Sequence, residues 1–155
     1  SRQPVAVCAN EGLWRVCDVR EVIKRRVADT LCFSSNWVGT LAAFHRLSWA
    51  AHQEGLTVCR HTHGELGLMA AASQHVCLTL PNLVDGNQQV AAMMADDILQ
   101  QPLPIATGPT WGIPEGVGLC VDVDVDKLRQ YHELYQEHGQ FLPYQAEMFV
   151  SPRQA

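Results

Sequence analysis

The stretch that decides the fold is residues 56–65, which reads Leu-Thr-Val-Cys-Arg-His-Thr-His-Gly-Glu. Its first half is a short apolar run, typical of a buried parallel strand, and the sequence that follows has helical character. Folds of the α/β class place their chemistry where a strand gives way to a helix. His61 and His63 point the same way in an extended chain, because side chains alternate with a period of two. We therefore expect a functional site here; the alternative is a pair of solvated histidines that cap the next helix.

Four segments of this kind recur along the chain. The expected strands begin at positions 4, 30, 56 and 82, each 26 residues after the last. A repeated strand–loop–helix unit gives parallel neighbours joined by right-handed crossovers. Each expected strand ends in polar residues: Asn10 and Glu11, then Ser35 and Asn36, then His61 and His63, then Asp85 and Asn87. Barrels of repeated units carry their catalytic groups on this rim.

The repeat stops after residue 87. We expect a helix over 88–99, a wrapping loop over 102–118, a strand over 119–123 and a last helix from Asp124 or Asp126 to about His138. The chain is thus predicted to be a single partial domain (1–155), with four βα units in 1–87 and a closing segment in 88–155. A complete (β/α)8 barrel takes around 250 residues. We predict an α/β fold that forms the C-terminal half of a TIM-type barrel, about strands 5–8; a flavodoxin-like doubly wound sheet is the alternative.

Composition narrows the class of protein. The chain has 155 residues, 47% of them hydrophobic, and a net charge of −5, so it is globular and a poor match for nucleic acid. No apolar run approaches the roughly 20 residues that span a bilayer, and the start does not resemble a signal peptide. Six cysteines without a Cys-x-x-Cys pair indicate buried reduced thiols, so we expect a cytoplasmic protein.

Three segments carry a resemblance to a known family. They are residues 7–14 (Val-Cys-Ala-Asn-Glu-Gly-Leu-Trp), the stretch 56–72, and residues 112–128 (Gly-Ile-Pro-Glu-Gly-Val-Gly-Leu-Cys-Val-Asp-Val-Asp-Val-Asp-Lys-Leu). The chain resembles the C-terminal half of an enolase-superfamily enzyme, in the mandelate racemase and muconate-lactonizing branch that includes the acid-sugar dehydratases. The resemblance covers positions 4 to about 139, and residues 112–128 are its most specific part.

The resemblance implies roles for several of the polar residues that end the strands. Glu11 falls on the third ligand of the family's Mg²⁺, and Asn10 is the alternative ligand. His61 falls on the family's base histidine, and Asp85 on the acid at the end of the eighth strand. From their places at the strand ends we expect substrate contacts from Ser35, Asn36, Asn87 and His63; the alternative for His63 is that it caps the next helix. The implied activity is sugar-acid dehydration, in which a proton α to a carboxylate is removed and water is eliminated; a racemase, epimerase or cycloisomerase is the alternative.

The chain departs from the family pattern in two places. No carboxylate follows the sixth strand at residues 32–37, so His61 lacks the acid that often orients it, and a role as hydrogen-bond donor or general acid stays open. The family's lysine pair, its first two metal ligands and its capping domain lie upstream of the matched region. We expect the N-terminal half or another chain to supply them, within a homo-oligomer. A His-x-His metal hydrolase and a non-catalytic half-barrel are further alternatives.

Overall fold

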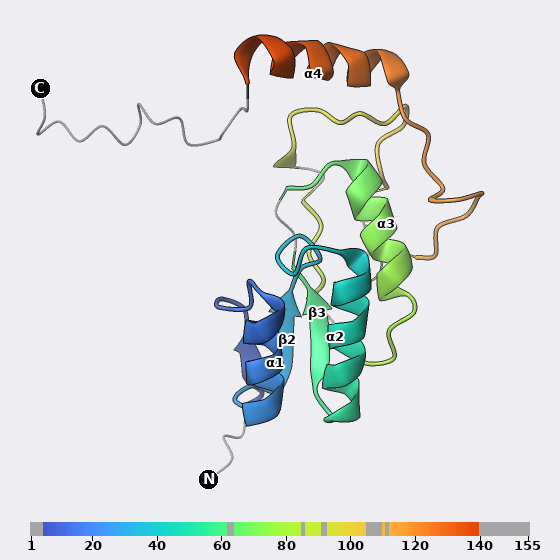
Figure 1. The fold of residues 1–155 in the computed structure, drawn as a ribbon. Helices are drawn as coiled ribbons and strands as arrows, with labels where there is room; N and C mark the ends of the chain where they lie inside the picture. The colour runs from blue at the N-terminus through green and yellow to red at the C-terminus, as the bar shows by residue number, and fades with distance from the viewer. Residues whose placement is uncertain are drawn as a thin grey trace, which may run out of the picture.

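Three parallel strands form the sheet, in the order in which they occur in the chain (Figure 1). The computed structural model describes residues 5–61, 64–84, 86–90, 93–104, 110 and 112–139, so His63 and Asp85 lie outside the described residues. The strands are β1 (Cys8–Ala9), β2 (Thr30–Phe33) and β3 (Thr57–Arg60). In the register, Thr30 pairs with Cys8 on one side and with Thr57 on the other.

The described residues also form four helices: α1 (Val16–Arg25), α2 (Leu41–Gln53), α3 (Gly67–Cys77) and α4 (Val125–His138). Their starts follow from local chemistry. The Thr40 side chain accepts from the Ala43 N–H, and the Asp124 carboxylate accepts from the amides of Asp126 and Lys127. Among the helices that the structure describes, none has the length and apolar character needed to cross a bilayer.

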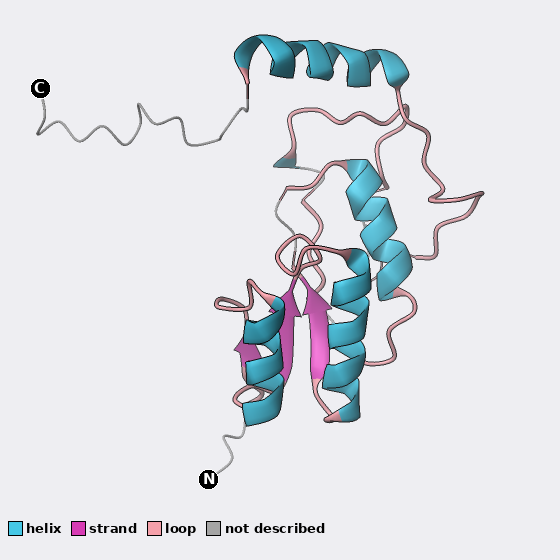
Figure 2. Cartoon of the chain, in the orientation of Figure 1, coloured by secondary structure: helices cyan, strands magenta, loops and turns pink. Residues whose placement is uncertain are grey.

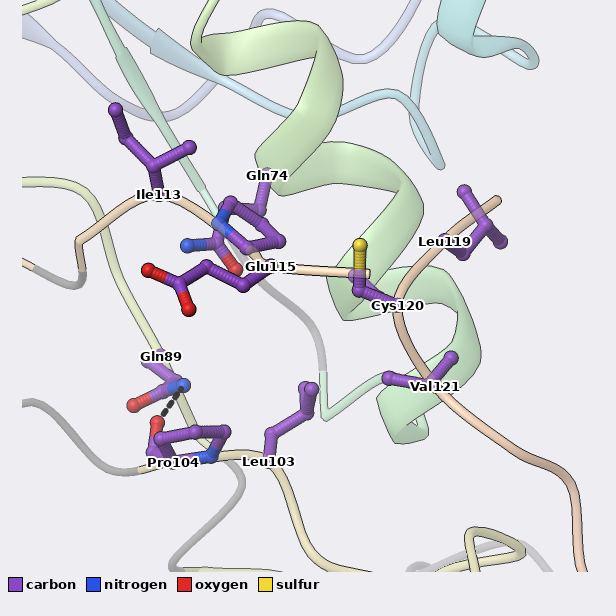
Figure 3. A pocket seen from close by; sticks show the side chains of 11 residues that line it. Gln74, Gln89, Leu103, Pro104, Ile113, Glu115, Leu119, Cys120 and Val121 are labelled. Carbon is purple, nitrogen blue, oxygen red and sulfur yellow. Dashed lines mark hydrogen bonds between the residues drawn. The ribbon is translucent and has the colours of Figure 1, made fainter. Parts of the chain in front are cut away.

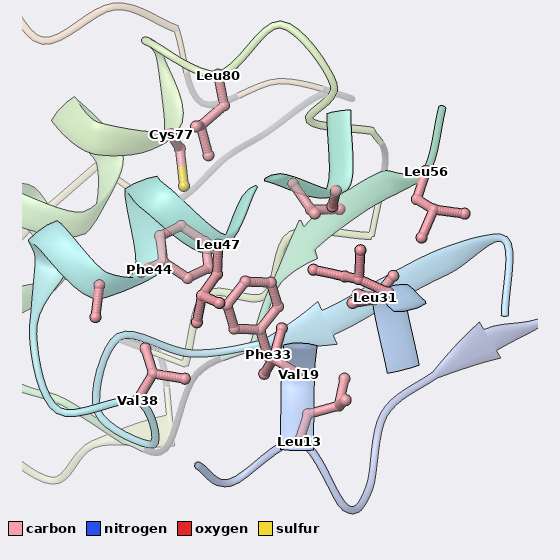
Figure 4. Close-up of a cluster of buried hydrophobic side chains, with 14 residues drawn as sticks. Leu13, Val19, Leu31, Phe33, Val38, Phe44, Leu47, Leu56, Cys77 and Leu80 are labelled. Carbon is pink, nitrogen blue, oxygen red and sulfur yellow. The ribbon is translucent and has the colours of Figure 1, made fainter. Parts of the chain in front are cut away.

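Both α1 and α2 cover one face of the sheet, as Figure 2 shows. Right-handed crossovers between strands that follow in sequential order place every helix on the same side, whereas a doubly wound sheet reverses its order and has helices on both sides. The predicted half-barrel is therefore confirmed, and the flavodoxin-like alternative is wrong. The core lies between the sheet and these helices, where Leu31, Phe33 and Val58 meet Phe44 and Leu47 (Figure 4).

The opposite face of the sheet carries short side chains. The hydroxyls of Thr30 and Thr57 are 2.7 Å apart, and Cys32 pairs with Cys59 one rung further along. Paired residues of neighbouring strands share a face, and side chains alternate along each strand. Thr57, Cys59 and His61 therefore lie on the same face, with His61 at the carboxyl end of the sheet. These side chains lie on the sheet face opposite the helix-packed core, which is the face that lines the interior of a barrel.

The fourth unit joins the sheet through a single bridge. Leu83 forms a parallel bridge with Val58, and within 82–84, the described part of the strand expected at 82–85, this bridge is the strand pairing present. The buried Asn82 side chain donates to the carbonyl oxygens of Ser48 at 3.1 Å and Leu56 at 2.9 Å. One amide therefore fixes the fourth unit to α2 and to the start of β3.

The closing segment differs from its prediction. Within 88–99 the described residues contain no α-helix, and the strand expected at 119–123 is reduced to one antiparallel bridge between Leu99 and Val123. Asp96 explains part of the difference, because its carboxylate accepts from Lys127 Nζ at 2.6 Å and from the Tyr131 hydroxyl at 2.7 Å. These contacts hold α4, which has no buried residue of its own.

Candidate active site

His61 is the first residue after β3 and lies at the carboxyl end of the sheet. Its main-chain N–H donates to the Phe33 carbonyl oxygen at 3.0 Å, so the β2–β3 ladder extends to this position. The parity of β3 places the His61 side chain with Thr57 and Cys59, on the face opposite the helices. Sequence and structure agree on its location at the rim.

Trp37 holds the His61 ring. The two rings are stacked with centroids 4.5 Å apart and an interplanar angle of 27°. Burial lowers the pKa of His61 below its ordinary value; the Glu11 charge acts to raise the pKa and Arg60 acts to lower it. The neutral imidazole is favoured, and a neutral imidazole has the lone pair that a general base needs.

Asn10 and Glu11 follow β1 directly and are both exposed. They lie at the same end of the sheet as His61, because the carboxyl ends of parallel strands meet at one edge. Glu11 is close enough for its charge to act on the His61 pKa. The structure thus places these three predicted site residues along a single rim.

The other predicted substrate contacts are placed differently from one another. Asn36 is exposed and its N–H donates to the Ser34 hydroxyl, whereas Ser35 is buried. The Asn87 amide oxygen accepts from the Arg60 N–H at 2.7 Å, and its nitrogen donates to the Val84 carbonyl oxygen. Substrate binding by these residues stays a prediction.

An ion pair between Arg60 and Glu65 was not predicted from the sequence. Both side chains are almost fully buried, with 4% and 6% exposed. A signal was present, because Arg60 shares its strand face with Val58, and a charge that faces a core needs a partner. The partner follows five positions later, across the two histidines.

Two of the cavities in the described part of the chain have linings without His61 or Glu11, although the second reaches the rim at Asn87. One of about 330 Å³ lies between α3 and the closing segment, where Gln74 faces Glu115 and Cys120 (Figure 3). The other, of about 600 Å³, has Arg60, Cys77 and Asn87 in its lining. We place the candidate active site at the part of the rim that carries His61 and Glu11, since barrels of this class carry their catalytic groups there.

The donors fit Mg²⁺ in type. A carboxylate and an amide oxygen at Glu11 and Asn10 are hard ligands of the kind that Mg²⁺ prefers. Among the described residues, however, no group of three or more His, Cys, Asp or Glu side chains is arranged to hold a metal ion. A complete magnesium site needs ligands beyond those this part of the chain provides.

Comparisons with known proteins agree with this geometry. The family described as "Enolase C-terminal domain-like" matches residues 1–127. Muconate cycloisomerase 1 from Rhodococcus opacus is 27% identical over 129 residues, which are 83% of this chain and 34% of that protein. The chain thus spans about a third of the length of this curated relative.

Solved structures show the same fold. The crystal structure of an isomerase from Streptomyces coelicolor is 29% identical, with a TM-score of 0.73, over 90% of this chain and 37% of that one. An enolase from Pseudomonas fluorescens, solved with bound magnesium, potassium and tartrate, is 21% identical with a TM-score of 0.73, over 90% of this chain and 33% of that one. At this identity the second likeness shows the fold alone.

Proposed function

Because this chain belongs to the enolase C-terminal domain-like family, we propose that it forms the C-terminal part of a barrel enzyme that moves the proton α to a substrate carboxylate. The position of His61 carries this proposal. Its ring lies at the rim, is stacked on Trp37 and is favoured in the neutral form. A group so placed is equipped to accept a proton at neutral pH.

The substrate that we propose is a sugar acid, and the reaction is the loss of water. After the α-proton has moved to His61, the β-hydroxyl leaves with a proton from a general acid. Asp85 is proposed for that role from its place after the fourth unit. His63, Asn36 and the other polar residues of the rim would contact the hydroxyls of the substrate.

Magnesium is the proposed cofactor, with Glu11 as a ligand from this chain and Asn10 as the alternative. When bound, the cation supplies positive charge opposite the negative charge that develops on the substrate carboxylate. The magnesium bound to the Pseudomonas fluorescens enolase supports this choice. The remaining ligands are proposed to come from the N-terminal half of the barrel, within the same protein or from another chain.

A cycloisomerase is the second candidate function. It is favoured by the similarity to muconate cycloisomerase 1. The same rim residues could serve either reaction, because both include a proton transfer to or from the carbon next to a carboxylate. The match to the enolase C-terminal domain-like family does not support the alternative of a His-x-His metal hydrolase.

The test uses the complete barrel, in which this chain is joined to or mixed with the other half, and Mg²⁺. Sugar acids and muconate are supplied in deuterated water, and both deuterium at the α-carbon and the product mass are followed. Deuterium uptake with loss of one water supports the dehydratase. A product that keeps every heavy atom of the substrate and carries deuterium at the α-carbon identifies the second candidate. The absence of uptake and of product with every substrate contradicts both.

A further inference from the structure

The two residues that flank positions 61–64 in the sequence, here called the histidine segment, form a buried ion pair. Arg60 is the last residue of β3 and Glu65 lies just before α3, so the pair closes the four-residue segment 61–64. Arg60 and His61 are adjacent in extended chain, and their side chains therefore leave the strand on opposite faces. The ion pair lies behind the strand and the imidazole in front of it.

Arg60 also makes three hydrogen bonds to the fourth unit. Its N–H donates to the Asn87 amide oxygen at 2.7 Å, and its carbonyl oxygen accepts from the Gln88 N–H at 3.1 Å. Its guanidinium donates to the Gln88 carbonyl oxygen at 2.9 Å. The residue before His61 is thus fixed to Glu65 on one side and to the fourth unit on the other.

Stability does not account for such an arrangement. Burying two charges costs about as much as their attraction returns, and apolar pairs of similar volume often replace buried ion pairs without loss. What a buried pair with directional hydrogen bonds provides is a single geometry. The exposed pair of Arg26 and Glu54, which joins the ends of α1 and α2, has the same chemistry and no such burial.

We propose that Arg60 and Glu65 are positioning residues, which fix the start of the histidine segment at His61 and thereby hold the His61 ring on Trp37 at the rim. Neither touches the substrate. Asn87 belongs to the same device, since its amide oxygen fixes the Arg60 main chain. This inference rests on the proposed function where it concerns turnover, and on geometry alone where it concerns the His61 ring.

The decisive variant replaces both charges together, Arg60→Met with Glu65→Leu, so that no buried charge is left alone. The matched control makes the same substitutions at the exposed pair, Arg26→Met with Glu54→Leu. Thermal unfolding of the full 155-residue chain reports stability. The NMR shifts of the His61 ring protons report the stack, because the Trp37 ring current shifts them only while the rings are in contact.

We expect the Arg60/Glu65 double variant to unfold near the wild-type temperature, to lose the ring-current shift, and to lower kcat of the complete enzyme about 10²-fold with a smaller change in KM. The control should change neither the shift nor kcat. Arg60→Lys keeps a positive charge opposite the Glu65 carboxylate. This variant should therefore retain part of the ring-current shift and part of kcat that the double variant loses. If the double variant does not fold, the comparison of Arg60→Lys with the control decides.

An unchanged ring-current shift in a folded double variant overturns the proposal, as does a lower unfolding temperature with shift and kcat intact. If the wild-type enzyme turns over none of the substrates, the proposed function fails by itself, and the NMR comparison still decides whether the pair positions His61.

Discussion

The Gly67 N–H, at the first residue of α3, donates to the Asp97 carboxylate at 2.8 Å, so a side chain thirty positions later caps this helix. A Cβ added to Gly67 would overlap Leu99 Cδ1 and lie 2.6 Å from Asp97 Oδ2. The absence of a side chain at Gly67 is what lets the closing segment approach α3.

Gly67→Ala should therefore lower the free energy of unfolding by about 1–3 kcal/mol, the usual cost of overpacking. Urea unfolding measures it. Leu99→Ala in the same chain removes one of the two overlapping groups, so the double variant should lose less than the sum of the single losses. Simple additivity would show that Leu99 is not the group that Gly67 accommodates.

His61→Asn should lower kcat of the complete enzyme by roughly 10²–10⁴, the usual worth of a positioned acid or base. His63→Asn should mainly raise KM, since we assign it to substrate contact. Steady-state kinetics and deuterium exchange at the α-carbon measure the two effects separately. Near-normal turnover and exchange in His61→Asn, with both lost in His63→Asn, would reverse the assignment.

Glu11→Gln should weaken Mg²⁺ binding to the complete barrel more than Asn10→Ala does, because only the carboxylate carries a charge that complements the cation. Titration calorimetry with Mg²⁺ gives both affinities. The opposite order would transfer the ligand role to Asn10.

The His61 pKa makes a prediction about pH. In the folded chain this pKa lies below its ordinary value of 6.5, mainly because of burial. As the pH falls below 6.5 the unfolded chain takes up this proton first, so the His61 contribution to the free energy of unfolding is full above 6.5 and is lost as the pH falls through the folded pKa. Urea unfolding between about pH 5 and pH 8 should show a shallower decline in His61→Asn than in the wild type. Parallel curves would mean that His61 titrates alike in both states.

Local chemistry was enough to predict much of the fold. Thr40 and Asp124 mark helix starts by their capping side chains. The 26-residue repeat, in which every strand ends in polar residues, predicted the half-barrel and the place of His61. These features depend on neighbours in sequence, which a sequence displays directly.

What could not be predicted depends on distant partners. The apolar spacing of 88–99 suggests a helix. In the structure, however, the Asp96 carboxylate accepts hydrogen bonds from Lys127 and Tyr131, and the Asp97 carboxylate accepts one from the first N–H of α3. Likewise, nothing near Trp37 in the sequence shows that its loop returns to the end of β3 and meets His61. Strand parity alone could have exposed Arg60 as a charge in need of a partner.

Asn82 has a consequence for how this protein can vary. Its amide nitrogen donates to two carbonyl oxygens, one at Ser48 in α2 and one at Leu56 just before β3. Aspartate has the same shape but would set a negative charge against both acceptors, leucine would leave them unserved, and glutamine carries its amide one carbon further from the backbone. Among the described residues that join the fourth unit to the rest, Asn82 is the position at which natural exchange should be rarest, although no catalytic or binding role is proposed for it.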